Sequence, residues 1–145
     1  MQNTKWAREH FPFFLSLATR WADNDMYGHV NNVTYYSYFD TAANQLLIQH
    51  CGFHPQTADQ IGLVVSSSCQ FKQEISYPEN IEVGVAIQRL GQSSIQYRLA
   101  IFKHHHVEPA AVGEFTHVFV ARQTRKSTPI SHGMRRALQP FLLNL

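Results

Sequence analysis

The stretch from Val33 to Ile48 constrains the fold most, because it contains a single charged residue, Asp40. Polar side chains recur in it at three- and four-residue spacing, which traces one stripe of an α-helix. These polar residues are Thr34, Ser37, Thr41 and Asn44. Nearly all the others are apolar or aromatic, whereas a helix on a protein surface has a wide polar face. We therefore expect a long helix that is surrounded by protein on most sides and that stops near Gly52.

The rest of the chain is typical of β-strands. A strand is expected from Phe13 to Trp21, and a short helix around Gly133 to Gln139. Between them, segments rich in Val, Ile, Phe and Tyr alternate with turn signals such as Tyr77-Pro78 and Gly91-Gln92. These segments are Leu63–Ser76, Ile81–Leu90, Ser94–Lys103 and Ala111–Ala121. Their short connections favour antiparallel pairing. The prediction is an α+β fold with an antiparallel sheet of about five strands packed on one long helix.

Composition narrows the class of protein. The 145 residues fit one domain covering 1–145, and 44% hydrophobic residues exclude a wholly disordered chain. No apolar run reaches the ~20 residues that span a bilayer, and the first residues lack a secretory signal. Two cysteines form no disulfide framework, which favours a reducing, cytoplasmic compartment. A net charge of +2 is too small to indicate a nucleic-acid partner.

The segment Asp23–Asn32, DNDMYGHVNN, is the strongest functional signal. It holds two carboxylates, a histidine and two asparagines directly before the expected helix. A helix N-terminus presents unpaired backbone N–H groups that stabilise an anion or an oxyanion. A carboxylate opposite them could act as a general base or as a nucleophile, so the arrangement suits acyl transfer. The structural alternative is a capped helix, with Asn31 or Asn32 as the N-cap and Gly28 for an unusual backbone angle.

Several motifs resemble those of the hot-dog-fold thioesterases, the group related to 4-hydroxybenzoyl-CoA and acyl-CoA thioesterases. The first is D-x-x-G-H-V-N-N, from Asp25 to Asn32, followed by an aromatic-rich helix. A proline turn into a strand (Ser76–Val83), an L-G-x-S-S hairpin (Leu90–Ser94) and a last strand (Ala111–Val120) follow in the family's order. The resemblance implies a hot-dog fold, in which a curved antiparallel sheet wraps one long central helix.

The resemblance also implies roles for residues of the loop. The family's catalytic carboxylate falls on Asp25, and its oxyanion-binding N–H groups fall near Asn31 and Asn32. His29 matches a histidine of the acyl-carrier-protein and long-chain acyl-CoA branches, where it would orient the loop or the substrate. The acyl-carrier-protein branch has asparagine where this chain has Tyr27, so the Asp25-centred arrangement is the one carried over.

The substrate is expected to contact Tyr27, Gly28 and Asn31 of the same loop. Further along the chain, three basic residues follow the last strand and could receive the phosphates of coenzyme A. They are Arg122, Arg125 and Lys126. A solvated surface cluster is the other interpretation of these residues.

Other chemically active residues are interpreted as structural. His104 and His106 would share one face of a strand, but no third metal ligand accompanies them, so no metal site is expected. Cys51 and Cys69 are expected to be buried and inert thiols. Asp40 is expected to make a buried hydrogen bond, although another hot-dog branch uses a helix carboxylate in catalysis.

The resulting hypothesis is an enzyme, an acyl-CoA thioesterase, that hydrolyses its substrate to a free acid and coenzyme A without a cofactor. Its catalytic residues would be Asp25, His29 and Asn32. The alternatives are a hot-dog dehydratase or hydratase, and a non-catalytic acyl-CoA-binding protein. Exposed sheet edges and the resemblance together predict a homodimer or homotetramer whose active sites lie between subunits.

Overall fold

The structure is a computed structural model that describes residues 6–143. Three short 3-10 turns, η2 (Arg8–His10), η3 (Trp21–Asp23) and η4 (Gln139–Phe141), accompany the regular elements. The helices and strands are β1 (Phe13–Ala18), α1 (Asn32–His50), β2 (Gln60–Phe71), β3 (Asn80–Leu90), β4 (Ser94–Lys103), β5 (Ala111–Ala121) and α2 (His132–Leu138). Within the described residues no helix is long and apolar enough to cross a membrane.

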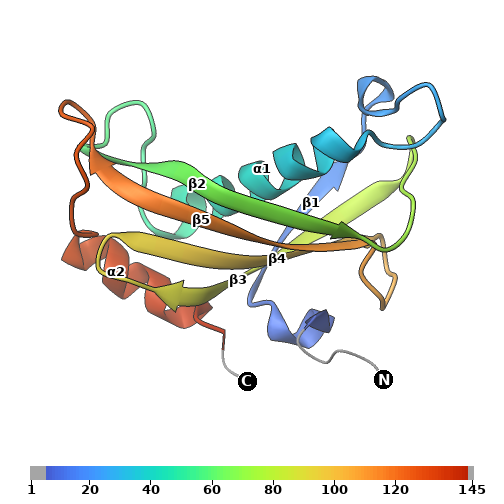
Figure 1. Ribbon diagram of the computed structural model, residues 1–145. Coiled ribbons are helices and arrows are strands. Elements are labelled where there is room, and N and C mark those ends of the chain that lie inside the picture. Colours follow the sequence, from blue (N-terminus) through green and yellow to red (C-terminus); the bar gives the residue numbers. More distant parts are fainter. Residues whose placement is uncertain (1–5, 144–145) are drawn as a thin grey trace.

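The five strands form one antiparallel sheet in the order β1-β3-β4-β5-β2, and α1 lies across one of its faces (Figure 1). The prediction of an α+β fold with five antiparallel strands and one long helix is confirmed. The helix ends at His50, and Gly52 follows with a φ of +63°, a conformation that glycine adopts readily. Strands β1 and β2 are the two edges of the sheet.

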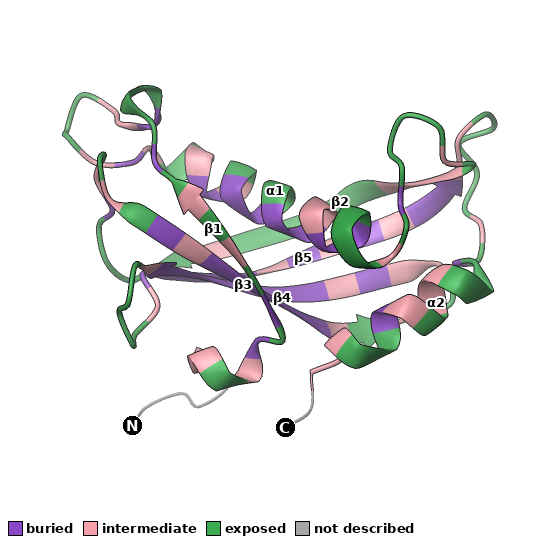
Figure 2. Ribbon diagram, turned by 180° about the vertical axis from the view of Figure 1, so that it is seen from behind, coloured by how far each residue is buried: buried purple, intermediate pink, exposed green. Residues whose placement is uncertain are grey.

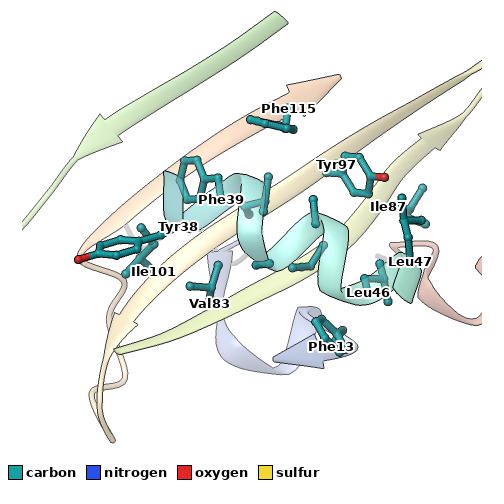
Figure 3. Close-up of a cluster of buried hydrophobic side chains, with 14 of the residues drawn as sticks. Phe13, Tyr38, Phe39, Leu46, Leu47, Val83, Ile87, Tyr97, Ile101 and Phe115 are labelled. Carbon is teal, nitrogen blue, oxygen red and sulfur yellow. The ribbon is translucent and has the colours of Figure 1, made fainter. Parts of the chain in front are cut away.

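The main core lies between α1 and the sheet. Alternate residues of β3, β4 and β5 point toward the helix, because successive side chains of a strand face opposite sides. Figure 3 shows Phe39 and Leu46 of α1 among Val83, Tyr97 and Phe115 of the strands. The helix packs very close to β5, since a Cβ atom at Gly113 would lie 2.6 Å from the ring of Phe39. Glycine at this position therefore allows Phe39 to approach β5, and it also avoids a still closer contact with the backbone carbonyl of Ser68 in β2.

Two predicted strands end earlier than expected. The strand predicted to reach Trp21 stops at Ala18, and the strand predicted to reach Ser76 stops at Phe71. In both places the backbone leaves the sheet to build the loop before α1. Residues 72–77 lie beside that loop, and η3 leads into it. Three consecutive polar residues, Lys72, Gln73 and Glu74, break the alternation directly after Phe71, so the predicted strand extended beyond the pattern that supports it.

The expectation that α1 is surrounded by protein on most sides is wrong for the single chain. One side of the helix is exposed, as is β2 from Leu63 to Ser68 (Figure 2). The exposed helix residues include Val33, Ser37, Asp40, Thr41 and Ile48. Asp40 is accordingly not buried, and its carboxylate accepts a hydrogen bond from Asn44 at 3.2 Å on the helix surface. The exposed side of the helix is mainly its polar stripe, whereas the exposed edge strand carries the apolar residues Leu63, Val64 and Val65.

Candidate active site

The loop before α1 folds back on itself between Asn24 and Val30, which form an isolated antiparallel bridge. The Asp25 N–H donates to the carbonyl of His29 at 2.9 Å, and the Gly28 N–H donates to the carbonyl of Asp25 at 3.2 Å. Gly28 has a φ of +86°, which the tight turn requires and which other residues rarely adopt. The turn therefore fixes the direction in which the side chains of Asp25 and His29 leave the backbone.

The segment after β2 holds this loop from the side. The Val30 N–H donates to the carbonyl of Ile75 at 2.7 Å, and the Ser76 hydroxyl donates to the carbonyl of Gly28 at 2.9 Å. The Tyr77 N–H donates to the side-chain oxygen of Asn24 at 3.1 Å. These bonds explain why residues 75–77 leave the sheet: they pair with the loop instead of with a neighbouring strand.

Asp23 anchors the beginning of the loop in the protein interior. Its residue is only 2% exposed, and its carboxylate accepts hydrogen bonds from the Tyr38 hydroxyl at 2.7 Å and from the Arg20 side chain at 2.9 Å. Burial alone would raise the pKa of Asp23, but the hydrogen bonds from Tyr38 and Arg20 outweigh it and hold the pKa below its ordinary value. Asp23 is therefore a buried structural anion that contributes stability above its ordinary pKa and loses that contribution in acid.

The first turn of α1 leaves one backbone donor available. Asn31 is the N-cap, because its side-chain oxygen accepts a hydrogen bond from the Val33 N–H at 3.1 Å. The Asn31 N–H itself donates to the carbonyl of Asp23 at 2.8 Å, and the Thr34 N–H donates to Asn31. Within the described residues no hydrogen bond uses the Asn32 N–H. Of the donors expected near Asn31 and Asn32, the Asn32 N–H is thus the one that can bind an oxyanion.

A cavity of about 510 Å³ lies between the loop, the start of α1 and the end of β2. Its wall combines polar and aromatic groups: Asp25, Tyr27, His29, Val30, Asn32, Tyr35, Phe71, Lys72, Gln73 and Glu74. The rings of Tyr35 and Phe71 meet edge to face with centroids 4.9 Å apart. A cavity with an apolar wall, a carboxylate and a free backbone donor can hold an acyl group and polarise its carbonyl.

One oxygen of the Asp25 carboxylate is already hydrogen-bonded to the backbone of its own loop. Its Oδ1 atom accepts a hydrogen bond from the Tyr27 N–H at 2.8 Å, which orients the side chain. His29 does not pair with Asp25 but lies with Nε2 at 2.9 Å from the Glu74 carboxylate. Glu74 and Lys72 were not among the residues expected at the site, because they are more than 40 positions away in sequence and follow no helical or strand period.

The structure brings Asp25, Tyr27, His29 and Asn32 to the same cavity. Gly28 and Asn31 shape the loop and the helix start, and neither is among the residues that line the cavity.

The basic residues after β5 lie at the other end of the molecule, as the turn after β5 and the loop before α1 show in Figure 1. Arg122 donates hydrogen bonds to the backbone carbonyls of Ala58 and Pro55 and thereby holds the loop before β2. Within one chain, therefore, Arg122, Arg125 and Lys126 do not reach the cavity.

The remaining candidates, His104, His106, Cys51 and Cys69, do not line this cavity. No cluster of metal-ligating side chains exists among residues 6–143, and His104 lies instead 3.7 Å from Glu82. Cys51 and Cys69 are half-buried free thiols, and burial raises the pKa of each to about 11. Such thiols are protonated at neutral pH and are therefore poor nucleophiles.

Comparison with known proteins places the chain in a family. The model of the thioesterase-like superfamily matches residues 19–138, so the chain belongs to this superfamily. The match includes the loop before α1, the helix and all strands from β2 to β5. Thioester hydrolysis is the class of reaction that the family supports.

Solved structures agree with this assignment. The PA5185 protein of Pseudomonas aeruginosa is 47% identical, with a TM-score of 0.92 over 94% of this chain and 96% of that chain. Slr0204 of Synechocystis, a 1,4-dihydroxy-2-naphthoyl-CoA thioesterase, is 18% identical, with a TM-score of 0.79 over 87% and 94% of the two chains. This second likeness shows the hot-dog fold. Among curated proteins, the uncharacterized YsmA of Bacillus subtilis is 24% identical over 117 residues, which cover 81% of this chain and 78% of YsmA.

Proposed function

We propose that the protein is an acyl-CoA thioesterase with its active site in the cavity between the loop Asn24–Val30 and the start of α1. One observation carries the proposal: the Asp25 carboxylate and the unpaired Asn32 N–H line the same cavity. The loop and the helix start thus supply a base and an oxyanion donor, the two groups that acyl transfer to water requires. The membership in the thioesterase-like superfamily supports the same reaction.

In the proposed reaction the thioester carbonyl oxygen accepts a hydrogen bond from the Asn32 N–H. Asp25 takes a proton from a water molecule, whose oxygen attacks the carbonyl carbon. The negative charge that develops on the oxygen is stabilised by the N–H group and by the positive end of the helix dipole. The carbon–sulfur bond then breaks, and the thiolate of coenzyme A leaves and is protonated. Asp25 could instead attack the carbonyl itself, in which case water hydrolyses the resulting anhydride.

The loop side chains next to Asp25 complete the site. His29 lines the cavity and orients the loop or the substrate, Tyr27 also lines the cavity, and Gly28 forms the turn between them. Tyr35 and Phe71 supply the apolar wall for the acyl group. The proposed reaction needs no cofactor, because a water molecule activated by Asp25 and a backbone N–H donor suffice for hydrolysis of a thioester.

A hydrolysis screen tests the proposed function. The purified protein is offered short, long, branched and aryl acyl-CoAs, and the free thiol is measured with a chromogenic disulfide. We expect thiol release from at least one class. A change in double-bond absorbance without thiol would instead indicate a hydratase or dehydratase. Tight binding of acyl-CoA without turnover would indicate a binding protein, and either result would contradict the proposal.

We further propose that the protein is a homodimer, or a homotetramer made of two such dimers, in which the subunits pair through β2. This strand is an edge of the sheet with exposed Leu63, Val64 and Val65, and edge strands of this kind pair with other chains unless they are covered. Its first residues lie beside Arg122, whose N–H donates to the carbonyl of Asp59 at 2.8 Å, and its last residue, Phe71, lines the cavity. Antiparallel pairing of two β2 strands would therefore bring the basic cluster of one subunit toward the cavity of the other.

If this pairing holds, the double variant Arg125→Gln, Lys126→Gln should raise KM for acyl-CoA and leave kcat nearly unchanged, because phosphate contacts contribute equally to ground and transition states. The effect should shrink as salt rises, since exposed charges are screened over ~10 Å at 0.1 M. Arg122 is left intact because it holds the loop before β2. Light scattering should give at least twice the chain mass of 16.7 kDa. A monomeric mass with full activity, or an unchanged KM at low salt, would contradict this arrangement.

A further inference from the structure

The histidine at the cavity has a carboxylate partner that comes from a distant part of the chain. The Nε2 atom of His29 lies 2.9 Å from a carboxylate oxygen of Glu74, on the segment that follows β2. The two side chains line the same cavity as Asp25. Asp25, in contrast, uses its Oδ1 atom to accept a hydrogen bond from its own loop, at the Tyr27 N–H. The cavity is therefore lined by two carboxylates in different environments: Asp25 is hydrogen-bonded to the loop backbone, and Glu74 lies next to the imidazole of His29.

We propose that Glu74 is a positioning residue that acts through His29. A carboxylate is an acceptor only, so a neutral imidazole facing it must carry its proton on Nε2 and leave the lone pair on Nδ1. A carboxylate in this position fixes both the tautomer and the orientation of the ring. The inference rests on the proposed function, and it assigns to Glu74 a role in preparing the histidine rather than in contacting the substrate.

The backbone around Glu74 gives the pair a defined geometry. The residues that directly follow Glu74 hold the histidine loop: Ile75 accepts from the Val30 N–H, and Ser76 donates to Gly28. Ile75 itself is fully buried in the core. The two residues after Glu74 therefore hold the residues on either side of His29, which keeps the two side chains within reach of each other.

The exposure of the two side chains sets the size of the expected effect. The Glu74 side chain is 74% exposed and that of His29 is 39% exposed, so solvent screens the interaction in the single chain. Exposed ion pairs couple weakly, and a loss of about threefold to fivefold in kcat is the corresponding expectation. If Glu74 acts through His29, its replacement should lower kcat only when His29 is present, whereas a general effect on folding would not depend on His29.

The test is a double-mutant cycle with Glu74→Ala and His29→Gln. Glu74→Ala alone should lower kcat about threefold to fivefold with little change in KM, whereas in the His29→Gln background it should change kcat less than about twofold. Glu74→Gln, which keeps an oxygen acceptor at the same reach, should retain most of the activity. An equal loss in both backgrounds would mean that Glu74 acts on substrate directly, and no loss in either would make the pair a surface contact; both results overturn the proposal.

A matched control is available in Glu9, whose exposed carboxylate also faces a histidine, His10, at 3.9 Å. Glu9→Ala should leave kcat and KM unchanged. Nitrogen-15 NMR of the His29 ring supplies a readout that does not depend on activity. We expect the Nε2–H tautomer in the parent protein and in Glu74→Gln, and a mixture of tautomers in Glu74→Ala. If no acyl-CoA is hydrolysed, the proposed function fails while this spectrum still decides the role of Glu74; an unchanged tautomer in Glu74→Ala would overturn it.

Discussion

Replacing Asp25 with asparagine is expected to lower kcat for acyl-CoA hydrolysis at least about a hundredfold, because a general base contributes roughly 10²–10⁴ in rate. KM should change much less. Asparagine is nearly the same size as aspartate, and its side-chain oxygen can still accept the hydrogen bond that the Tyr27 N–H donates at 2.8 Å. The loop should therefore keep its shape, and the midpoint of urea unfolding should stay near that of the parent protein. Steady-state thiol release and urea unfolding are the two measurements.

Asp40→Asn is the matched control for this variant. Asp40 is an exposed carboxylate on α1 whose neighbour Asn44 donates a hydrogen bond to it, so its replacement should be tolerated by the fold. If Asp40→Asn loses activity and Asp25→Asn does not, the base lies on the helix and the proposed mechanism is wrong. Asp23 cannot serve as a neutral control, because its carboxylate is buried and bonded to Tyr38 and Arg20. Its replacement should reduce stability at neutral pH.

The second large effect concerns stability in mild acid. His117 of β5 is only 1% exposed, with its Nδ1 atom 3.0 Å from the hydroxyl of Tyr97 on β4 and with the rings of Phe115 and Phe119 around it. Burial lowers the pKa of His117 to about 4. The unfolded chain binds this proton near pH 6.5, so the folded state loses stability as the pH falls from about 6.5 to about 4. The loss should approach roughly 3 kcal/mol, a large fraction of the stability of a domain of this size.

Urea unfolding at several pH values measures this loss. His117→Gln removes the titrating group and should flatten the dependence between pH 6.5 and 4, even where it lowers stability at pH 7. His54→Gln changes an exposed histidine and should leave the dependence as it is in the parent protein. If the parent protein is equally stable at pH 7 and pH 4.5, or if His117→Gln has the same pH dependence as the parent, the histidine is not responsible.

The parts of the fold that follow from local patterns were predictable from the sequence. Strands β4 and β5 have the predicted bounds, because each is an uninterrupted run of strand-forming residues closed by turn signals. The helix was predictable from its period, and its N-cap was narrowed to Asn31 or Asn32, of which the structure shows Asn31. The enclosure of the helix was overestimated, because the polar stripe that includes Ser37 and Thr41 is the side that the chain leaves exposed.

Only those residues of the candidate site that are close together in sequence were predictable. Asp25, His29 and Asn32 lie in the loop and the first residue of α1, so they are visible as a cluster in the sequence. Glu74 reaches the same cavity from the segment that follows β2, and nothing near it in sequence indicates this. The structural role of Asp23 was also not predictable. The sequence does not show that Asp23 is buried and Asp25 is not, and the partner of Asp23, Tyr38, lies 15 positions away in the helix. Long-range pairs of this kind require the tertiary structure.

The bond between Asp23 and Tyr38 has a consequence for protein engineering. It joins the loop before α1 to the buried side of the helix, so the loop cannot be transplanted on its own. Transplanting residues 23–32 into a related scaffold would leave a buried carboxylate without its donor unless the tyrosine is transplanted as well, and an unpaired buried anion is costly. A chimera that alters substrate choice in this family should therefore exchange loop and tyrosine together, or keep both and vary the aromatic wall formed by Tyr35 and Phe71 instead.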